Sequence, residues 1–395
     1  MKKRLLFKQL QKHLEKKQIS LIIGARQTGK TTLMHQLIEE FKHKNIPHFF
    51  INLEDPLLLD LLNEHPEKLF QVLPPLNSDK RTIILIDEIQ YLDNPSNFLK
   101  YHYDKRQGKI KFIVSGSSSF YIDRKFTDSL AGRKRIFRLP TLSFGEFLNF
   151  RNREDILGAM NNIVIPEIYK NELQNLQNEY ILYGGYPDVV TEPNIEEKQL
   201  LLAEIAESYV KKDALETGLK YPEAYLNILS TLANMVGNLL NINNLAANLM
   251  LNKATLESYL RLMQKSFHIK TIKPFHQNIA KELRKMPKVF FADLGLRNHF
   301  TNDYTPFLLR KDKGALFENF IYRLFADKLQ EDSIKFWRTQ KGQEIDFIIN
   351  NNKAFEVKFS KAAFKPNKYK YFKSKYPHIP IKLIHYENVS EIFKV

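Results

Sequence analysis

Residues 19–33 read Ile-Ser-Leu-Ile-Ile-Gly-Ala-Arg-Gln-Thr-Gly-Lys-Thr-Thr-Leu, an apolar strand pattern that runs into Gly24-x-x-x-x-Gly29-Lys30-Thr31 and then into a helical pattern. Glycine accepts backbone angles that residues with a Cβ resist, so the N–H groups of this loop can point inward at one anion. The helix that follows adds the positive end of its dipole. The stretch predicts a phosphate-binding loop. An ordinary glycine turn is the weaker alternative, because strand, loop and helix all agree.

Each part of this loop has an expected role in holding a nucleotide. Lys30 is expected to reach the β- and γ-phosphates, and the Thr31 hydroxyl is expected to hold Mg²⁺. The predicted cofactor-binding residues are Gly24, Ala25, Arg26, Gln27, Thr28, Gly29, Lys30, Thr31 and Thr32. The sequence has no Asn-Lys-x-Asp stretch that would read guanine, which favours ATP as the nucleotide.

A second motif turns nucleotide binding into expected hydrolysis. Thr82-Ile83-Ile84-Leu85-Ile86-Asp87-Glu88 is a continuous apolar run, typical of a strand buried on both faces of a parallel sheet, and it ends in two carboxylates. Asp87 is expected to hold Mg²⁺ through its water shell. Glu88 is expected to orient and deprotonate the attacking water. The alternative for Glu88 is a solvated acidic strand end.

At this point the chain resembles the AAA+ ATPases. Lys111-Phe-Ile-Val-Ser115-Gly-Ser117 is similar to the strand whose polar end senses the γ-phosphate, with Ser115 or Ser117 in that role. Asn52 closes the strand pattern that starts at Pro47 and resembles the polar switch residue that restrains the catalytic carboxylate. The resemblance therefore implies catalytic roles for Ser115 and Asn52.

The segment Leu130-Ala-Gly-Arg133-Lys-Arg135 resembles the one that supplies an arginine finger. A planar guanidinium that is always charged suits the charge developing on a transferred phosphoryl group. A finger of this kind would act on a neighbouring subunit and would imply a homo-oligomer. The open alternative is that Arg133, Arg135 and Arg138 only form surface ion pairs.

The composition agrees with a nucleic-acid partner. The formal net charge is +16 over 395 residues, and the pI is near 9.5. Such a balance points to a polyanion, usually nucleic acid, although compositional drift over a solvated surface is an alternative. The length suggests about two to four domains.

Other features of the composition bear on the compartment. The sequence has no cysteine, which excludes disulfides and thiolate metal sites and is compatible with a reducing compartment. In Met1-Lys-Lys-Arg-Leu-Leu-Phe-Lys-Gln-Leu the apolar residues are broken by polar ones, unlike a signal-peptide core. No apolar run approaches the length needed to cross a membrane. We therefore expect a cytoplasmic protein with no membrane partner.

The chain pattern predicts an α/β multidomain protein. Residues 1–150 alternate strand and helix patterns, as in a doubly wound sheet, and form the expected AAA+ P-loop ATPase domain. Residues 151–220 are expected to form a helical lid or linker, residues 221–303 a winged-helix domain, and residues 304–395 a restriction-endonuclease-like domain. The stretch Tyr183-Gly184-Gly185-Tyr186-Pro187 predicts a turn between helices, with a structural role favoured over a chemical one.

The winged-helix prediction rests on three helical patterns, 228–236, 242–249 and 254–267, followed by possible wing strands at 269–274 and 288–293. A recognition helix would fall on the third pattern, with candidate residues Thr255, Ser258, Tyr259 and Arg261. Such modules often serve as packing spacers in multidomain ATPases, so a spacer is favoured over base-specific reading.

The last segment contains a second possible active site. Its patterns follow the order αβββαβ and resemble the restriction-endonuclease-like core with its PD-(D/E)XK motif. Asp346 stands for the lone aspartate, and Glu356-Val357-Lys358 stands for the second half. The resemblance implies a metal-dependent nuclease in which Asp346, Glu356 and Lys358 are catalytic.

The strand register supports that resemblance independently. If the Asn350-Asn351-Asn352 turn is centred on Asn351, Asp346 falls directly opposite Glu356. Two like charges so close destabilise a sheet unless a cation neutralises them, and oxygen ligands suit Mg²⁺.

The expected metal ligands are Asp346 and Glu356, with Glu318 completing the shell. Lys358 would orient water or stabilise charge on the scissile phosphate. The alternatives are a solvated hairpin with ordinary charges and a core of the right fold that no longer cleaves.

A lysine-rich segment follows the motif. Its lysines match a phosphate backbone, and its aromatic residues offer either base stacking or core packing, two alternatives of equal weight. The lysines are Lys358, Lys361, Lys365, Lys368, Lys370, Lys373 and Lys375, and the aromatic residues are Phe364, Tyr369, Tyr371, Phe372 and Tyr376.

Over nearly its whole length the chain resembles the prokaryotic AAA+ ATPases that carry a C-terminal domain of unknown function. The resemblance includes the Gly184-Gly185-Tyr186-Pro187 turn and Tyr209-Val-Lys-Lys-Asp213. The leading hypothesis is an ATP-hydrolysing motor or switch that acts on nucleic acid, most simply DNA, with a metal-dependent nuclease as effector. The alternative is a nucleotide-controlled adaptor whose nuclease-like core only binds DNA or protein.

Overall fold

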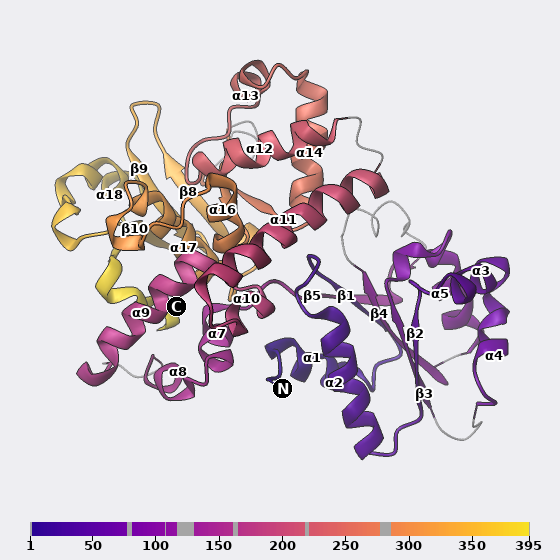
Figure 1. Cartoon of the computed structure of the whole chain (residues 1–395). Helices are drawn as coiled ribbons and strands as arrows, with labels where there is room; N and C mark the ends of the chain where they lie inside the picture. Colours follow the sequence, from indigo (N-terminus) through magenta and orange to yellow (C-terminus); the bar gives the residue numbers. More distant parts are fainter. Residues whose placement is uncertain are drawn as a thin grey trace. The chain divides into compact units, whose positions relative to one another are not determined.

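The computed structural model describes residues 2–76, 81–106, 108–116, 130–160, 165–217, 221–276 and 286–394, with the backbone alone described over 209–217 and 393–394 (Figure 1). The chain divides into two compact units. The first comprises Met1–Pro140 with Lys265–Phe267, and the second comprises Thr141–Gln264 with His268–Val395.

The first unit is built on a parallel sheet. Within the described residues its strand order is β2-β3-β4-β1-β5, and every neighbouring pair is parallel. The strands are β1 Ile19–Ile23, β2 His48–Asn52, β3 Thr82–Asp87, β4 Ile110–Gly116 and β5 Lys134–Arg138. Strands β1, β3 and β4 are buried along their full length, as continuous apolar runs predict. The predicted α/β class with a parallel sheet is confirmed for this unit.

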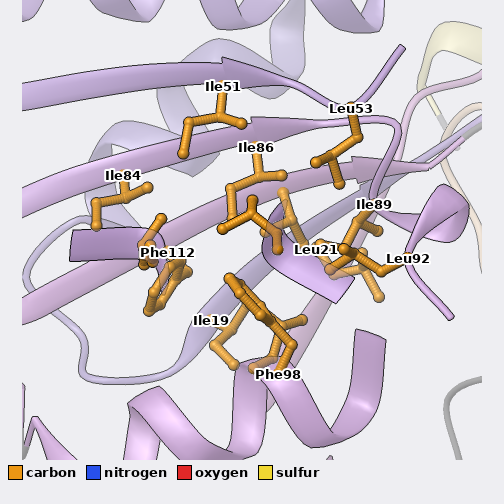
Figure 2. Close-up of a cluster of buried hydrophobic side chains, with 14 of the residues drawn as sticks. Ile19, Leu21, Ile51, Leu53, Ile84, Ile86, Ile89, Leu92, Phe98 and Phe112 are labelled. Carbon is orange, nitrogen blue, oxygen red and sulfur yellow. The ribbon is translucent and has the colours of Figure 1, made fainter. Parts of the chain in front are cut away.

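Helices cover both faces of this sheet, because alternate residues of a strand point to opposite sides. Ile83 and Leu85 of β3 pack in one cluster with α1 (Leu5–His13) and α2 (Lys30–His43). Ile84 and Ile86 of the same strand pack in a second cluster (Figure 2). The helices of that second face are α3 Pro56–Glu64, α4 Leu69–Val72 and α5 Pro95–Lys105. The carboxyl ends of the strands are thereby held rigidly around the loop that follows β1.

The second unit combines many helices with a mixed sheet. Its described helices include α7 Phe144–Phe150, α8 Glu154–Met160, α9 Glu167–Tyr183, α10 Pro187–Thr191, α11 Ile195–Thr217, α12 Pro222–Asn234, α13 Ile242–Asn248, α14 Lys253–Lys265, α16 Leu294–Thr301, α17 Lys313–Ala326 and α18 Lys370–Lys375. The three helical patterns predicted over 228–267 are found as α12, α13 and α14.

The sheet of the second unit has the described order β11-β10-β9-β8-β6-β7. Its strands are β6 Ile269–Pro274, β7 Lys288–Phe291, β8 Ile334–Arg338, β9 Glu344–Ile349, β10 Lys353–Val357 and β11 Ile381–Ile384. The two strands predicted for the wing pair antiparallel as β6 and β7, and β6 also pairs parallel to β8. These two strands therefore continue the C-terminal sheet. Strand β7 ends at Phe291, before Asp293, because the Asp293 side chain caps α16 by accepting from the Leu296 N–H.

The glycine turn between α9 and α10 has a structural explanation. Gly184 has a φ of 73°, and a Cβ on it would lie 2.2 Å from Oδ1 of Asp293. The Gly185 N–H donates to Oδ2 of Asp293 at 2.8 Å. The turn is thus fixed against α16 through one buried carboxylate, as a structural role predicts.

Across the described segments, none of the helices combines the length and the apolar character that crossing a membrane requires.

Candidate functional site

The loop between β1 and α2 has the backbone that a phosphate-binding loop needs. Gly29 has a φ of 86°, and Gln27 has a φ of 58°. At Gly24 the need for glycine is steric, because a Cβ would lie 2.2 Å from the carbonyl oxygen of Leu139. The Thr28 hydroxyl donates to the Ala25 carbonyl at 2.9 Å and closes the loop from within.

The side chain of Lys30 folds back over the phosphate-binding loop. Its Nζ donates to the carbonyl oxygens of Gly24 at 3.1 Å and Ala25 at 2.9 Å. Burial lowers the pKa of Lys30, while Glu88 and Asp87 oppose that effect. The ammonium therefore sits among neutral acceptors, and the anionic oxygens of a phosphate would bind it more strongly.

A second cation stabilises the loop from outside, and the sequence analysis missed it. Arg4 donates from Nη1 to the Thr28 carbonyl and from Nη2 to the Pro140 carbonyl, each at 2.8 Å. The fixed fork of a guanidinium suits two acceptors at once. The only signal in the sequence was a cluster of basic residues near Met1, which does not identify its partners.

The predicted magnesium ligands meet at the end of β3. The Thr31 hydroxyl donates to Oδ2 of Asp87 at 2.6 Å, and the Ser115 hydroxyl donates to Oδ1. Asp87 is buried. Two oxygens placed side by side, one from a hydroxyl and one from a carboxylate, fit a hydrated Mg²⁺. Ser115, predicted as a sensor of phosphate, is thus connected to the expected metal site; Ser117 lies outside the described residues.

Glu88 has a constrained backbone. Its φ of 54° places it in the left-handed region, and its N–H donates to the Ser115 hydroxyl at 3.1 Å. Non-glycine residues held in this region are uncommon and gather at functional sites. The side-chain contact of Glu88 comes from Gln90, whose Nε2 donates to Oε2. Asn52, the expected switch residue, instead accepts the N–H of Glu54 at 3.0 Å.

The candidate arginine finger forms an ion pair within its own unit. Arg133 binds both carboxylate oxygens of Asp104, at 2.9 and 3.2 Å, and its side chain is partly exposed. Arg135 and Arg138 are exposed on the edge strand β5. The alternative of surface ion pairing therefore describes Arg133 in a single chain.

The predicted nuclease residues converge in the second unit. The β9–β10 register pairs Phe355 with Phe347, and its continuation by one residue sets Glu356 opposite Asp346. The Val357 N–H donates to Oδ2 of Asp346 at 2.8 Å. Lys358 Nζ lies 2.5 Å from Oε1 of Glu356 and 3.4 Å from Oδ2 of Asp346.

A lysine that the sequence analysis did not assign to this site lies among the same carboxylates. Nζ of Lys288 is 2.8 Å from Glu318, 2.5 Å from Glu344 and 3.9 Å from Asp346. Among the residues that the structure describes, no three His, Cys, Asp or Glu side chains are arranged to hold a metal ion. The carboxylates as placed pair with the ammonium groups of Lys288 and Lys358.

Burial and charge act on the pKa values of this cluster. Burial raises the pKa of Glu318, Lys288 opposes that effect, and the neighbouring Asp346 adds to it. Burial likewise raises the pKa of Glu356. For Lys288, burial favours the neutral amine, but the surrounding carboxylates outweigh it and raise the pKa above its ordinary value. Lys288 is therefore charged in the folded protein.

In the lysine-rich segment the lysine side chains are exposed, whereas most of the aromatic rings are buried. Tyr369, Phe372 and Tyr376 are buried with Trp337 in the core, whereas Tyr371 is 50% exposed. Core packing is therefore the correct alternative for three of the aromatic residues. The exposed lysines are Lys361, Lys365, Lys368, Lys370, Lys373 and Lys375.

One of the four candidate residues on the predicted recognition helix is not exposed to a nucleic acid. Tyr259 of α14 is buried, and its hydroxyl accepts the Tyr221 N–H at 3.1 Å. Its candidacy for base reading is wrong, because the ring packs inside the unit. Ser258 and Arg261 are exposed, and Thr255 is half-buried.

Three family models match successive parts of the chain. Residues 16–148 match a family described as an AAA domain. Residues 174–305 and 313–391 match two separate families described as domains of unknown function, DUF8612 and DUF4143. The first match covers the loop, the strand ending in Asp87 and the sheet that holds them.

Two related proteins match this chain over most of its length. An uncharacterized protein of Methanocaldococcus jannaschii is 26% identical over 343 residues, which cover 84% of this chain and 72% of that protein. An uncharacterized protein of Haemophilus influenzae is 26% identical over 362 residues, covering 88% of this chain and 82% of its own length.

Two solved structures overlap in part. The RuvB Holliday junction branch migration motor of Thermotoga maritima is 17% identical, covers 70% of this chain and 93% of its own, and has a TM-score of 0.33. The replication initiator DnaA bound to AMPPCP and single-stranded DNA is 13% identical, covers 66% of this chain and 88% of its own, and has a TM-score of 0.33. The loop geometry, the parallel sheet and the family match agree in making residues 16–148 similar to a P-loop domain of the AAA type.

Proposed function

We propose that the N-terminal unit hydrolyses ATP with Mg²⁺. The observation that carries this proposal is the connection from Thr31 through Asp87 to Ser115, which joins the first turn of α2 to the ends of β3 and β4. These are the positions where a phosphate chain lying on the loop would present its terminal group. Bound Mg²⁺ would neutralise charge on the phosphates, and Thr31 and Asp87 would hold it.

The residues of this site divide the work of hydrolysis. Lys30 exchanges its contacts with the carbonyls of Gly24 and Ala25 for phosphate oxygens when a nucleotide binds. Glu88 is the general base, since its backbone is fixed next to Ser115 and its carboxylate lies at the open end of β3. Release of the Gln90 contact would free Glu88 to accept a proton from the attacking water.

Two variants test ATP binding and ATP hydrolysis separately. Lys30→Ala should lose tight ATP binding, because the substitution removes the cation that faces the phosphates. Glu88→Gln should bind ATP as the wild type does but should stall hydrolysis. Affinity and turnover are measured separately on the full chain. Wild-type turnover in Glu88→Gln would show that another group is the base.

We also propose that the second unit binds nucleic acid through the exposed lysines of residues 361–375. Their side chains reach solvent while three of the aromatic rings between them are buried, so the surface offers mainly charge, with Tyr371 as its one exposed ring among the described residues of this segment. Binding would then be largely electrostatic and insensitive to sequence. DNA is the first polymer to test, given the net charge of +16.

We also propose that the chain forms a homo-oligomer in which Arg133 acts on the nucleotide of a neighbouring subunit. Arg133 forms a partly exposed ion pair with Asp104, and a pair of that kind contributes little to stability, so its exchange for a phosphate of a neighbouring subunit is energetically accessible. Arg133→Ala should then reduce turnover in the assembled protein while leaving nucleotide affinity intact. Analytical ultracentrifugation with and without ATP gives the assembly state, and a monomer that hydrolyses ATP at the full rate would contradict this role.

A third candidate function is cleavage of nucleic acid by the carboxylate cluster of the second unit, as the PD-(D/E)XK resemblance implies. It requires a divalent cation at Asp346 and Glu356. The ion pairs of Lys288 and Lys358 favour the other hypothesis, an adaptor that binds nucleic acid or protein without cutting. A cleavage assay with Mg²⁺ and Mn²⁺ on DNA and RNA, comparing the wild type with Asp346→Ala, distinguishes the two.

A further inference from the structure

Strands β9 and β10 bring like charges together. Asp346 and Glu356 face one another across the ladder, and Glu318 of α17 and Glu344 of β9 lie beside them around one point. Like charges directly opposite destabilise a sheet, and carboxylates removed from water need a partner of opposite charge. The cluster therefore needs cations, and the identity of those cations decides what it can do.

Lys288 supplies the charge at the centre of the cluster. Only 1% of the Lys288 surface is exposed, and its Nζ lies within 2.8 Å of Glu318 and Glu344 and 3.9 Å from Asp346. The ring of Phe336 lies 5.6 Å from the ammonium and adds a further favourable contact. Lys288 belongs to β7, at one edge of the sheet, and not to the motif that contains Asp346 and Glu356.

Two further cations pair with the cluster, and Oε2 of Glu356 has no hydrogen-bond partner among the described residues. Lys358 binds Glu356 and Asp346, and the second oxygen of Glu344 accepts from Arg338 at 2.8 Å. A divalent cation entering between Glu318 and Asp346 would have to displace the Lys288 ammonium. That ammonium would then stay buried with Glu344 as the one remaining carboxylate of the three that now face it, which is unfavourable.

We propose that Lys288 is a built-in cation that takes the place of the divalent metal in this endonuclease-like core. The wild-type core then binds no divalent cation between Glu318 and Asp346 and does not cleave phosphodiesters there. The carboxylates serve instead to anchor β7 to α17 and β9. This inference goes beyond the proposed ATPase and nucleic-acid binding and depends on neither, so its test can fail without affecting them.

The experiment uses Mn²⁺ alone, without nucleotide, and follows its binding to the full chain by electron paramagnetic resonance. Wild type and Asp346→Asn should bind Mn²⁺ equally, because Asp346 holds no metal. Lys288→Ala removes the ammonium and opens space, so its affinity for Mn²⁺ should rise by about tenfold or more. The added site should disappear in the double variant Lys288→Ala/Asp346→Asn.

Two controls separate this effect from a general loss of charge. Lys288→Arg keeps the cation and should gain no site. Lys270→Ala removes a lysine of the neighbouring strand β6 that pairs with Glu331 at 2.5 Å, outside the cluster, and should also gain none. A Lys288→Ala protein that unfolds still leaves the comparison of wild type with Asp346→Asn. Tighter Mn²⁺ binding by the wild type than by Asp346→Asn would overturn the proposal.

Discussion

The hydroxyl of Thr31 donates a 2.6 Å hydrogen bond to Oδ2 of Asp87, a residue 56 positions later in the chain. The bond joins the start of α2, just after the phosphate-binding loop, to the carboxyl end of a buried strand. Because both groups are oxygen ligands, the contact that stabilises the loop also brings together the two groups that would hold Mg²⁺. Structure and proposed chemistry therefore depend on the same pair.

The hydroxyl of Thr31 should be essential for Mg²⁺-dependent turnover, whereas the methyl group of Thr31 should not. Thr31→Val keeps the shape but removes the oxygen, so we expect Mg²⁺-dependent turnover to fall by about tenfold or more. Thr31→Ser keeps the oxygen and should stay within a few-fold of the wild type. Turnover is measured as a function of Mg²⁺ concentration. An unchanged Mg²⁺ dependence in Thr31→Val would exclude Thr31 as a ligand.

Gln90 should restrain Glu88. The Gln90 amide donates to Oε2 of Glu88 and so occupies an oxygen that could otherwise accept a proton. Gln90→Leu removes the donor, so we expect basal turnover to rise severalfold with nucleotide affinity unchanged. The double variant with Glu88→Gln should be as inactive as Glu88→Gln alone. A fall in turnover in Gln90→Leu would instead assign Gln90 to orienting the base.

Acid should destabilise the N-terminal unit through His102. This residue of α5 is fully buried, and its Nε2 lies 2.9 Å from the Pro66 carbonyl, which can only accept. Nε2 therefore carries the hydrogen, and Nδ1 has no partner among the described residues. Burial lowers the pKa of His102 from 6.5 to about 4. The unfolded chain thus takes up a proton before the folded one, so the contribution to stability is complete above the unfolded pKa and is lost as the pH falls towards 4.

The measurement is urea unfolding of wild type and His102→Phe at two pH values. The phenylalanine keeps an aromatic ring and cannot be protonated. Between about pH 7.5 and about pH 5 the wild type should lose about 2 kcal/mol more of its free energy of unfolding than His102→Phe does. His102→Phe should start lower, because it loses the bond to Pro66. Equal losses in the two proteins would show that His102 is accessible to protons.

The sequence predicted those parts of the molecule that local patterns determine. The β1 run, the spacing from Gly24 to Lys30 and the run ending in Asp87 each contain their own signal within a few residues, and the parallel sheet follows from them. The burial of Tyr259 also has a local signal in the sequence. Leu256, Tyr259, Leu260 and Met263 recur at helical spacing on one buried face.

The remaining site residues depend on long-range pairing. Lys288 faces the carboxylates only because β6 pairs with β8 and places β7 at the sheet edge, and nothing in the sequence around Lys288 specifies that pairing. Arg4 contacts Thr28 and Pro140, which lie far from it in the sequence. Register set by distant strands cannot be read from a local pattern, whereas a hairpin turn fixes its own register, as the turn at Asn351 does for Asp346 and Glu356.

Neutralising the exposed lysines should weaken nucleic-acid binding in a way that depends on salt. The triple variant Lys365→Gln/Lys368→Gln/Lys370→Gln removes three solvent-facing charges while leaving the buried aromatic core intact. Each lost phosphate contact should flatten the plot of log affinity against log salt by roughly one unit of slope. Affinity for different DNA sequences should fall uniformly, because phosphate contacts carry no base information.

The matched control for this variant is the triple replacement of Lys8, Lys12 and Lys100 by Gln, which changes the net charge equally through exposed lysines of the N-terminal unit. If the basic segment of the second unit is the binding surface, this control keeps the wild-type slope and loses little affinity. If the two triple variants behave alike, binding reflects the net charge of the chain and not a defined surface. An unaltered slope in the first variant alone would move the interface to the exposed face of α14, where Ser258 and Arg261 lie.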